Sequence, residues 1–268
     1  MKKWLGLLLL PMSLCAVEVQ PWFGNVYEFH FLGAYSYSRF NQVEGAVPQL
    51  TNHFQASVVY LGLDLAVSPQ WSFDADFQLA DTTAQSFNVR STAAQARYLW
   101  LDDITGDPVT LTTGFNIRYT PDHALHDVSC PSHSNADFEL NGSVGKEFGM
   151  NETCLLRTWA FASVGHGIVG SPWVRGMLAV ETNINDQHRV GLFAEGISGY
   201  GSKTHIDPNH FDGYAKVRNK AIDLSVRYGV RTGVWGTLRF EYTRRVLARV
   251  CPENVNTWTI SYLLPFSL

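Results

Sequence analysis

The stretch VYEFHFLGAYSYS, residues 26–38, decides the fold. Large aromatic side chains alternate in it with polar or small ones. One face carries Tyr27, Phe29, Phe31, Gly33, Tyr35 and Tyr37, and the other carries Glu28, His30, Ala34, Ser36 and Ser38. A period of two over this length predicts a β-strand that is long enough to cross a bilayer, with one apolar and one polar face.

The same alternation recurs along the whole chain. It predicts about twelve strands, over residues 26–38, 59–66, 73–79, 87–100, 109–119, 137–148, 154–165, 173–182, 188–199, 220–231, 234–246 and 257–268. An even number of antiparallel strands is typical of bacterial single-chain membrane barrels. The alternative is a soluble β-sandwich, whose strands also alternate but are usually only about five or six residues long.

The connections between these segments alternate between short and long. The short ones are 68–70, 102–107, 150–153, 183–187 and 232–233, and the long ones are 40–53, 81–86, 120–136, 166–172, 200–219 and 247–256. Membrane barrels have short periplasmic turns and longer extracellular loops. The pattern therefore predicts that every long connection lies outside the cell.

The last predicted strand alternates up to the final residue. Its apolar side chains are Trp258, Ile260, Tyr262, Leu264, Phe266 and Leu268. This end resembles the C-terminal strand of Gram-negative outer-membrane β-barrel proteins, although that strand more often ends in Phe, and Pro265 must occupy a site that needs no ladder donor. The resemblance implies an all-β, porin-like antiparallel barrel in the outer membrane, and assembly machinery that recognises this strand.

The N-terminus predicts export. Lys2 and Lys3 precede an apolar run at 4–10 that is too short to span a membrane as a helix. We expect a signal peptide at 1–16 and a barrel domain at 17–268.

Without Lys2 and Lys3, 18 basic residues remain against 24 acidic ones, so the sequence gives no basic patch for nucleic acid. Only 16% of residues are charged and 13% are aromatic, which suits a wall facing lipid.

Charged residues of both signs fall on the predicted inner faces. The predicted pore-lining residues are Glu28, Asp64, Asp74, Asp76, Arg97, Arg118, Arg175, Arg227, Arg239 and Glu241. Either these charges pair and fill the interior, or an acidic arc opposes a basic one and creates a transverse field, as in porin constrictions. The sequence favours a passive or weakly selective channel for small polar solutes, and a structural or adhesive barrel without an open pore is the alternative.

Two loops hold clusters of potential ligands. The first cluster is Asp122, His123, His126, Asp127, Cys130 and His133, and the second is His205, Asp207, His210 and Asp212. Imidazole, thiolate and carboxylate groups bind zinc or copper. The spacing matches no standard zinc motif, however, so we expect polar loops and neither a metal nor a cofactor.

A hydrolase is a second alternative function. His133, Ser134 and Asn135 loosely resemble the His-x-Ser-Asn-Gly stretch of outer-membrane phospholipases, but here His and Ser are adjacent and Ala136 replaces the glycine. Adjacent residues of a strand point to opposite faces. An enzyme would need His133 beside Ser134 or Ser132, and no catalytic residue is assigned.

Three cysteines remain after the predicted signal peptide. Cys130 and Cys251 fall in long loops, whereas Cys154 begins a strand at the opposite end. Because exported proteins form disulfides, we expect a Cys130–Cys251 bridge across the outer mouth.

Overall fold

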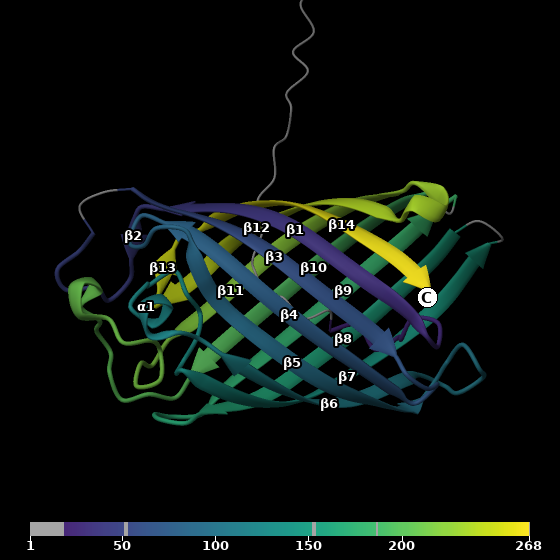
Figure 1. Ribbon diagram of the computed structural model, residues 1–268, viewed down its shortest axis with the longest axis horizontal. Coiled ribbons are helices and arrows are strands. Elements are labelled where there is room, and N and C mark those ends of the chain that lie inside the picture. Colours follow the sequence, from purple (N-terminus) through teal and green to yellow (C-terminus); the bar gives the residue numbers. More distant parts are fainter. Residues whose placement is uncertain (1–18, 51–52, 152–153, 186, 268) are drawn as a thin grey trace, which may run out of the picture.

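The computed structural model describes residues 19–50, 53–151, 154–185 and 187–267. In this part of the chain, twelve long antiparallel strands form one closed barrel (Figure 1). They are β1 (Glu28–Phe40), β3 (Phe54–Ala66), β4 (Trp71–Thr82), β5 (Asn88–Leu101), β6 (Thr110–Tyr119), β7 (Ala136–Asn151), β8 (Cys154–Gly167), β9 (Trp173–Ile184), β10 (His188–Gly199), β11 (Lys220–Arg231), β12 (Thr237–Arg249) and β14 (Asn256–Ser267). The fold predicted from the sequence is confirmed, whereas the predicted signal peptide lies outside the described residues.

Each long strand pairs with its neighbours in the chain, and β1 pairs with β14 to close the barrel. Closure leaves no exposed sheet edge, which is what allows β-structure to cross lipid. The predicted strand at 234–246 begins later, at Thr237. The reason is a short 3-10 helix, η2 (Gly233–Trp235), followed by Gly236 at φ 106°, a conformation that favours glycine.

The two faces of the wall differ as the alternation predicts. Outward side chains are large, apolar and exposed, as with Leu140 at 61% and Leu178 at 65%, whereas the inward Ser72 and Thr110 are fully buried. Such an exterior is stable against lipid and not against water. No helix among the described residues is long and apolar enough to span a bilayer.

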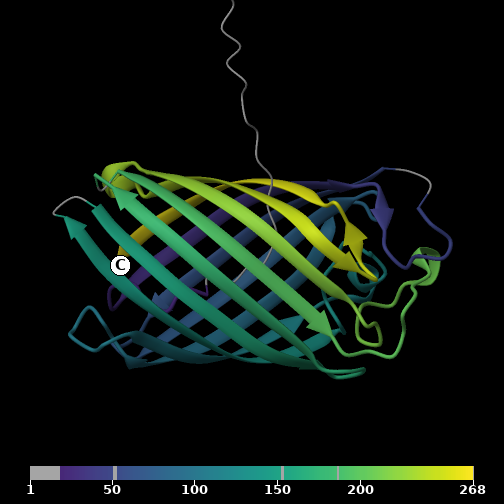
Figure 2. The ribbon, with the colours of Figure 1, turned by 180° about the vertical axis from the view of Figure 1, so that it is seen from behind.

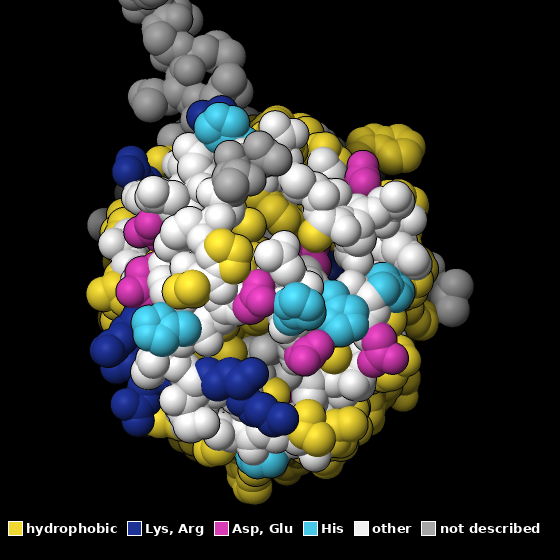
Figure 3. Space-filling view, turned by 90° about the vertical axis from the view of Figure 1, so that its left-hand side faces the viewer, with side chains coloured by type: hydrophobic (Ala, Val, Ile, Leu, Met, Phe, Trp, Pro, Cys, Tyr) yellow, Lys and Arg dark blue, Asp and Glu magenta, His cyan; other side chains and the backbone are white. Residues whose placement is uncertain are grey.

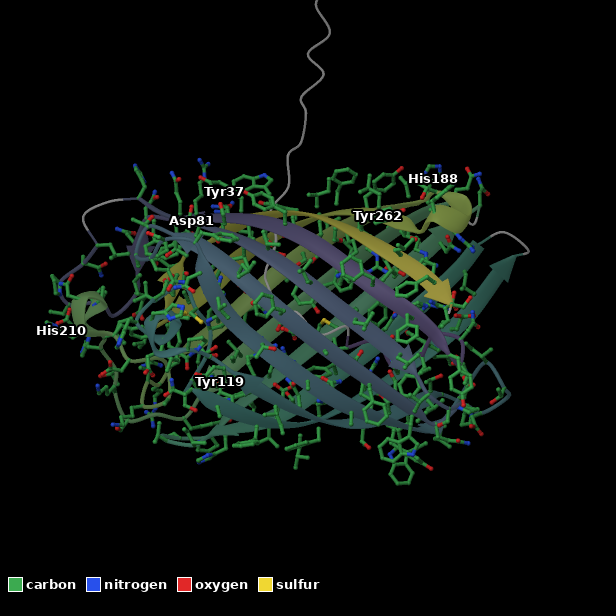
Figure 4. The ribbon with its side chains drawn as sticks, in the orientation of Figure 1. Tyr37, Asp81, Tyr119, His188, His210 and Tyr262 are labelled. Atoms are coloured by element: carbon green, nitrogen blue, oxygen red, sulfur yellow. The ribbon has the colours of Figure 1, made fainter. Side chains whose placement is uncertain are left out.

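The barrel has two different ends. At the turn end the strands are joined by short turns, and the C-terminal strand β14 ends there. The longer connections lie at the loop end (Figures 1 and 2). Outward tyrosines lie near both ends, with Tyr37 and Tyr119 near the loop end and Tyr262 near the turn end (Figure 4). Aromatic side chains at both interfaces are typical of membrane barrels.

The orientation gives a first prediction. A label attached at Asp207→Cys, in the loop end, should react on intact cells, whereas one at Pro69→Cys, in a turn, should react only after the outer membrane is permeabilised. The reason is that the loop end is expected to face outward. Equal labelling of both positions by a membrane-impermeant maleimide would reject this orientation.

Candidate functional site

The inner wall of the barrel is the candidate site. All ten predicted pore-lining residues stand on the inward faces of their strands. Asp76, Arg97, Arg239 and Glu241 are buried, with 4 to 8% of their surface exposed, and Glu28 lies beside the inward His30, 3.8 Å away. Whether these residues line a conducting path stays a prediction.

The inward charges are paired locally. Arg97 contacts Asp74 at 3.0 Å and Asp64 at 3.7 Å. Further pairs join Arg118 to Asp76 at 3.2 Å, Arg175 to Glu139 at 2.9 Å, Arg227 to Glu241, and Arg245 to Asp223 at 2.8 Å. Acid and base lie one or two strands apart in these pairs. Of the two alternatives for the inward charges, local pairing is therefore the one found, and an acidic arc opposing a basic arc does not form. The interior is instead a set of compensated pairs.

The segment before β1 lies inside the barrel. Residues 19–25 enter the half of the lumen nearer the turn end, as the purple trace of Figure 1 shows. Ser143 Oγ donates a hydrogen bond to the Val19 carbonyl at 2.6 Å, and Arg97 donates to the Gln20 carbonyl at 3.0 Å. We call residues 19–25 the N-terminal plug.

Two aromatic rings anchor the N-terminal plug. Trp22 is only 5% exposed; its ring packs edge-on against Trp159 at 5.8 Å, and the guanidinium of Arg157 lies over it at 5.1 Å. Its indole N–H donates to Asp103 at 2.9 Å. The Arg97 guanidinium lies over the Phe23 ring at 5.0 Å. The plug therefore makes aromatic, cation–π and hydrogen-bond contacts with the wall, none of them covalent.

The loop end is closed by its own loops. The loop cap, as we call it, consists of residues 41–50, 120–135, 168–172, 200–219 and 250–255. Its core is apolar and contains Val43, Val128, Ile206, Phe211, Tyr214 and Val217, all buried. Two short strands, β2 (Gln42–Val43) and β13 (Pro252–Glu253), pair across it, and backbone hydrogen bonds join Tyr214 to Ser132 and Ala215 to His133.

His133 separates an outer pocket from the lumen. A pocket of about 490 Å³ on the loop end, which we call the mouth pocket, and a lumen cavity of about 80 Å³ both have His133 in their lining. The lumen cavity shares Arg90, Pro131 and Ile197 with a second one of about 120 Å³. His133 therefore lies between the mouth pocket and the lumen cavity.

The His133 ring is buried and stacked on Trp173, with 5.0 Å between the ring centroids. Its Nε2 has no hydrogen-bond partner, and burial lowers the pKa of this side chain to about 3. The hydroxyl groups beside it bond elsewhere, since Thr120 donates to Ser132 and Ser134 donates to the Ala136 carbonyl. Neither Ser132 nor Ser134 is therefore hydrogen-bonded to the His133 ring, although the hydrolase hypothesis requires such a bond.

Most of the histidines and acids of the two loop clusters line the mouth pocket. His126 contacts Asp212 at 3.3 Å, and His210 contacts Asp207 at 2.8 Å. Hydrogen bonding to Asp207 raises the pKa of His210. Figure 3 shows His and acidic side chains next to one another on this face. Within the part of the chain that the structure describes, no three such groups are arranged to hold a metal.

The expected disulfide is not formed in the structure. Cys130 and Cys251 are both buried free thiols. The Cys130 thiol donates to Ser132 Oγ at 3.5 Å, and that of Cys251 donates to the Lys220 carbonyl at 3.2 Å. Apolar packing holds the two loops together instead, since Val128, Val250 and Cys251 belong to one buried cluster.

Neither the N-terminal plug nor the loop cap was predicted from the sequence. The N-terminal plug could have been recognised from Trp22 and Phe23. These two aromatic residues directly precede the first wall strand, and a simple linker at that position would need none. The loop cap could have been recognised from the apolar residues Ile206, Phe211 and Tyr214, which lie in a loop that the sequence was expected to leave polar. Their burial shows that these segments have packing partners.

Comparisons with known proteins agree on the architecture. No protein-family model and no curated protein matches the chain by sequence. Among solved structures, a COG4313 outer membrane channel from Pseudomonas putida F1 is 12% identical, with a TM-score of 0.63 over 91% of this chain and 97% of that one. The NanC porin is 10% identical, with a TM-score of 0.54 over 88% and 98%. The translocator domain of the autotransporter NalP from Neisseria meningitidis is 8% identical, with a TM-score of 0.50 over 91% and 90%.

These similarities establish the fold. Together with the closed sheet and the apolar exterior, they show that the chain has the fold of the outer-membrane β-barrels to which it is similar.

Proposed function

We propose that the protein is an outer-membrane channel for small polar solutes, and that the described state is its closed state. The observation that carries this proposal is the contrast between wall and closures. The wall carries paired charges beside one apolar patch, Trp159, Ala179 and Phe193, which receives Trp22. The obstructions are the N-terminal plug and the loop cap, which lie outside the barrel strands and are held by reversible contacts.

The polar wall supports solute passage. A barrel interior that serves only for packing needs no buried charges, because apolar side chains fill such a space without a desolvation cost. Here Arg97, Arg118, Arg175 and Arg239 are inward, together with hydroxyl and amide side chains such as Thr112 and Asn116. Paired groups of this kind can exchange partners with water and polar solutes.

Liposome swelling tests the proposal. Proteoliposomes with the wild-type protein should admit a small sugar slowly, and those with Trp22→Ala should admit it much faster. A large dextran should enter neither. If the sugar stays out of both preparations, although gel mobility shows that both are folded, the protein is not a channel.

Ion selectivity gives a further prediction. Arg118→Gln removes the partner of the buried Asp76 carboxylate, so the lumen gains net negative charge and should favour cations; Arg239→Gln should shift selectivity the same way. Reversal potentials in a salt gradient measure the shift. Arg244→Gln, at an exposed position on the outer face, is the matched control and should leave the reversal potential unchanged.

A barrel without an open pore is the second candidate, because both ends are occupied and the inward charges are paired. It differs from the channel in one measurable respect. If the barrel has no pore, releasing the N-terminal plug and the loop cap should lower the free energy of unfolding of the protein without producing ion flow.

A further inference from the structure

The outer wall near the loop end carries two successive rows of side chains. The first is aromatic, because Tyr37 of β1 and Tyr242 of β12 both pair in register with Trp258 of β14. Two residues farther toward the loop end, Arg39 and Arg244 both pair with Asn256. The Arg39 guanidinium lies over the Trp258 ring at 5.4 Å. Aromatic residues mark the edge of the hydrocarbon region, so Arg39 and Arg244 lie at headgroup level.

The neighbouring strands continue this positive charge. Lys220 of β11 and Arg249 of β12 are directly opposite each other, although like charges in that position repel. Arg218 precedes Lys220 and is also exposed. We call Arg39, Arg218, Lys220, Arg244 and Arg249 the rim cations.

No ion pair is found for the rim cations among the described residues, although Glu253 lies in the same pocket as Arg39. Other arginines of the chain, such as Arg97, Arg175 and Arg245, form ion pairs. The outward Asp81 is on β4, separated from β1 by β3. The patch therefore presents a majority of positive charge just above an apolar wall, where Ile222 and Leu247 are more than 40% exposed.

A polar pocket adjoins the patch. It has a volume of about 410 Å³ and includes Arg39, the amide side chains of Asn41, Gln42, Gln55, Asn254 and Asn256, and also His53, Glu253 and Phe40. Amide groups both donate and accept hydrogen bonds, as sugar hydroxyl groups require. The rim thus combines groups that suit phosphate with groups that suit carbohydrate.

We propose that this rim binds the phosphate groups of a phosphorylated glycolipid in the outer leaflet, with the amide pocket holding part of its sugar headgroup. Lysine and arginine clusters beside a membrane bind anionic lipid, and guanidinium groups form strong charge-assisted hydrogen bonds with phosphate. The inference rests on the membrane position and orientation of the barrel. It does not depend on whether the barrel conducts.

Binding of diphosphoryl lipid A tests the proposal. The purified protein, in vesicles of phosphatidylcholine with and without diphosphoryl lipid A, is compared with Arg244→Gln/Arg249→Gln and with the matched control Arg231→Gln, an exposed arginine at the turn end. Lipid retained after detergent extraction is measured by native mass spectrometry. Each lost cation should weaken binding about fivefold, so the double variant should bind about 25-fold more weakly.

Three outcomes decide the matter. Retention of lipid A by the wild type and by Arg231→Gln, with loss in the double variant, supports the proposal. Equal retention by all three proteins overturns it. Displacement of lipid A by the same concentration of inorganic phosphate also overturns it, because the site would then recognise free phosphate rather than a glycolipid. Heat-modifiable gel mobility confirms that each variant is folded.

Discussion

Trp22→Ala should raise the open probability of the channel on the order of a hundredfold. Trp22 is buried against Trp159 and Arg157 and anchors the N-terminal plug. Truncating a buried aromatic residue costs about 3 to 5 kcal/mol. Here the substitution destabilises only the state in which the N-terminal plug occupies the lumen, because Trp22 makes these contacts in that state alone. Single-channel recording in planar bilayers measures the change.

Trp235→Ala is the matched control for this experiment. Trp235 lies at the same end of the barrel, but it is 72% exposed, so its loss removes no lumen contact. The control should keep the wild-type open probability. An equal rise in both variants would show that the effect comes from general loosening of the turn end.

Acidification should open the loop cap. In the closed cap burial holds the pKa of His133 at about 3, whereas a solvent-exposed histidine has a pKa of about 6.5. The closed state therefore favours neutral His133, and its stability falls as the pH drops below about 6.5 and continues to fall until about pH 3. At pH 5 the cap equilibrium should shift toward the open form by about 25-fold relative to pH 7.

Substitution identifies the group responsible for the pH response. Asp137, which accepts a hydrogen bond from the His133 backbone N–H, and the rings of Trp173 and Tyr214 surround His133. His133→Gln should abolish most of the increase in conductance between pH 7 and pH 5. His126→Gln changes a more exposed histidine in the same loop and should retain it. Retention of the full response by His133→Gln would assign the switch to another group.

The barrel itself could be predicted from the sequence. Alternation over stretches such as 26–38 reflects a local rule, that successive side chains of a strand point to opposite faces. The same rule placed the charges on the inner wall. Because β1, β3 and the following strands pair in chain order, neighbouring segments were enough to assign the topology.

The closures could not be predicted in the same way, because they depend on contacts between distant segments. Val19 and Ser143 are far apart in the chain, yet they are joined by a hydrogen bond. Nor does alternation say which acid an inward arginine will contact: Arg118 of β6 reaches past β5 to Asp76 of β4. The disulfide was expected from loop positions alone, but each thiol has a different partner.

The most direct test of a channel with two closures in series is planar-bilayer recording of the wild type and Trp22→Ala, each at pH 7 and pH 5. If the two closures open independently, the fold-increases caused by the substitution and by acid should multiply, and the open conductance should be the same in every case. The wild type at pH 7 should be almost always closed. Absence of ion flow through folded Trp22→Ala at pH 5 would contradict the account and leave a barrel without a pore.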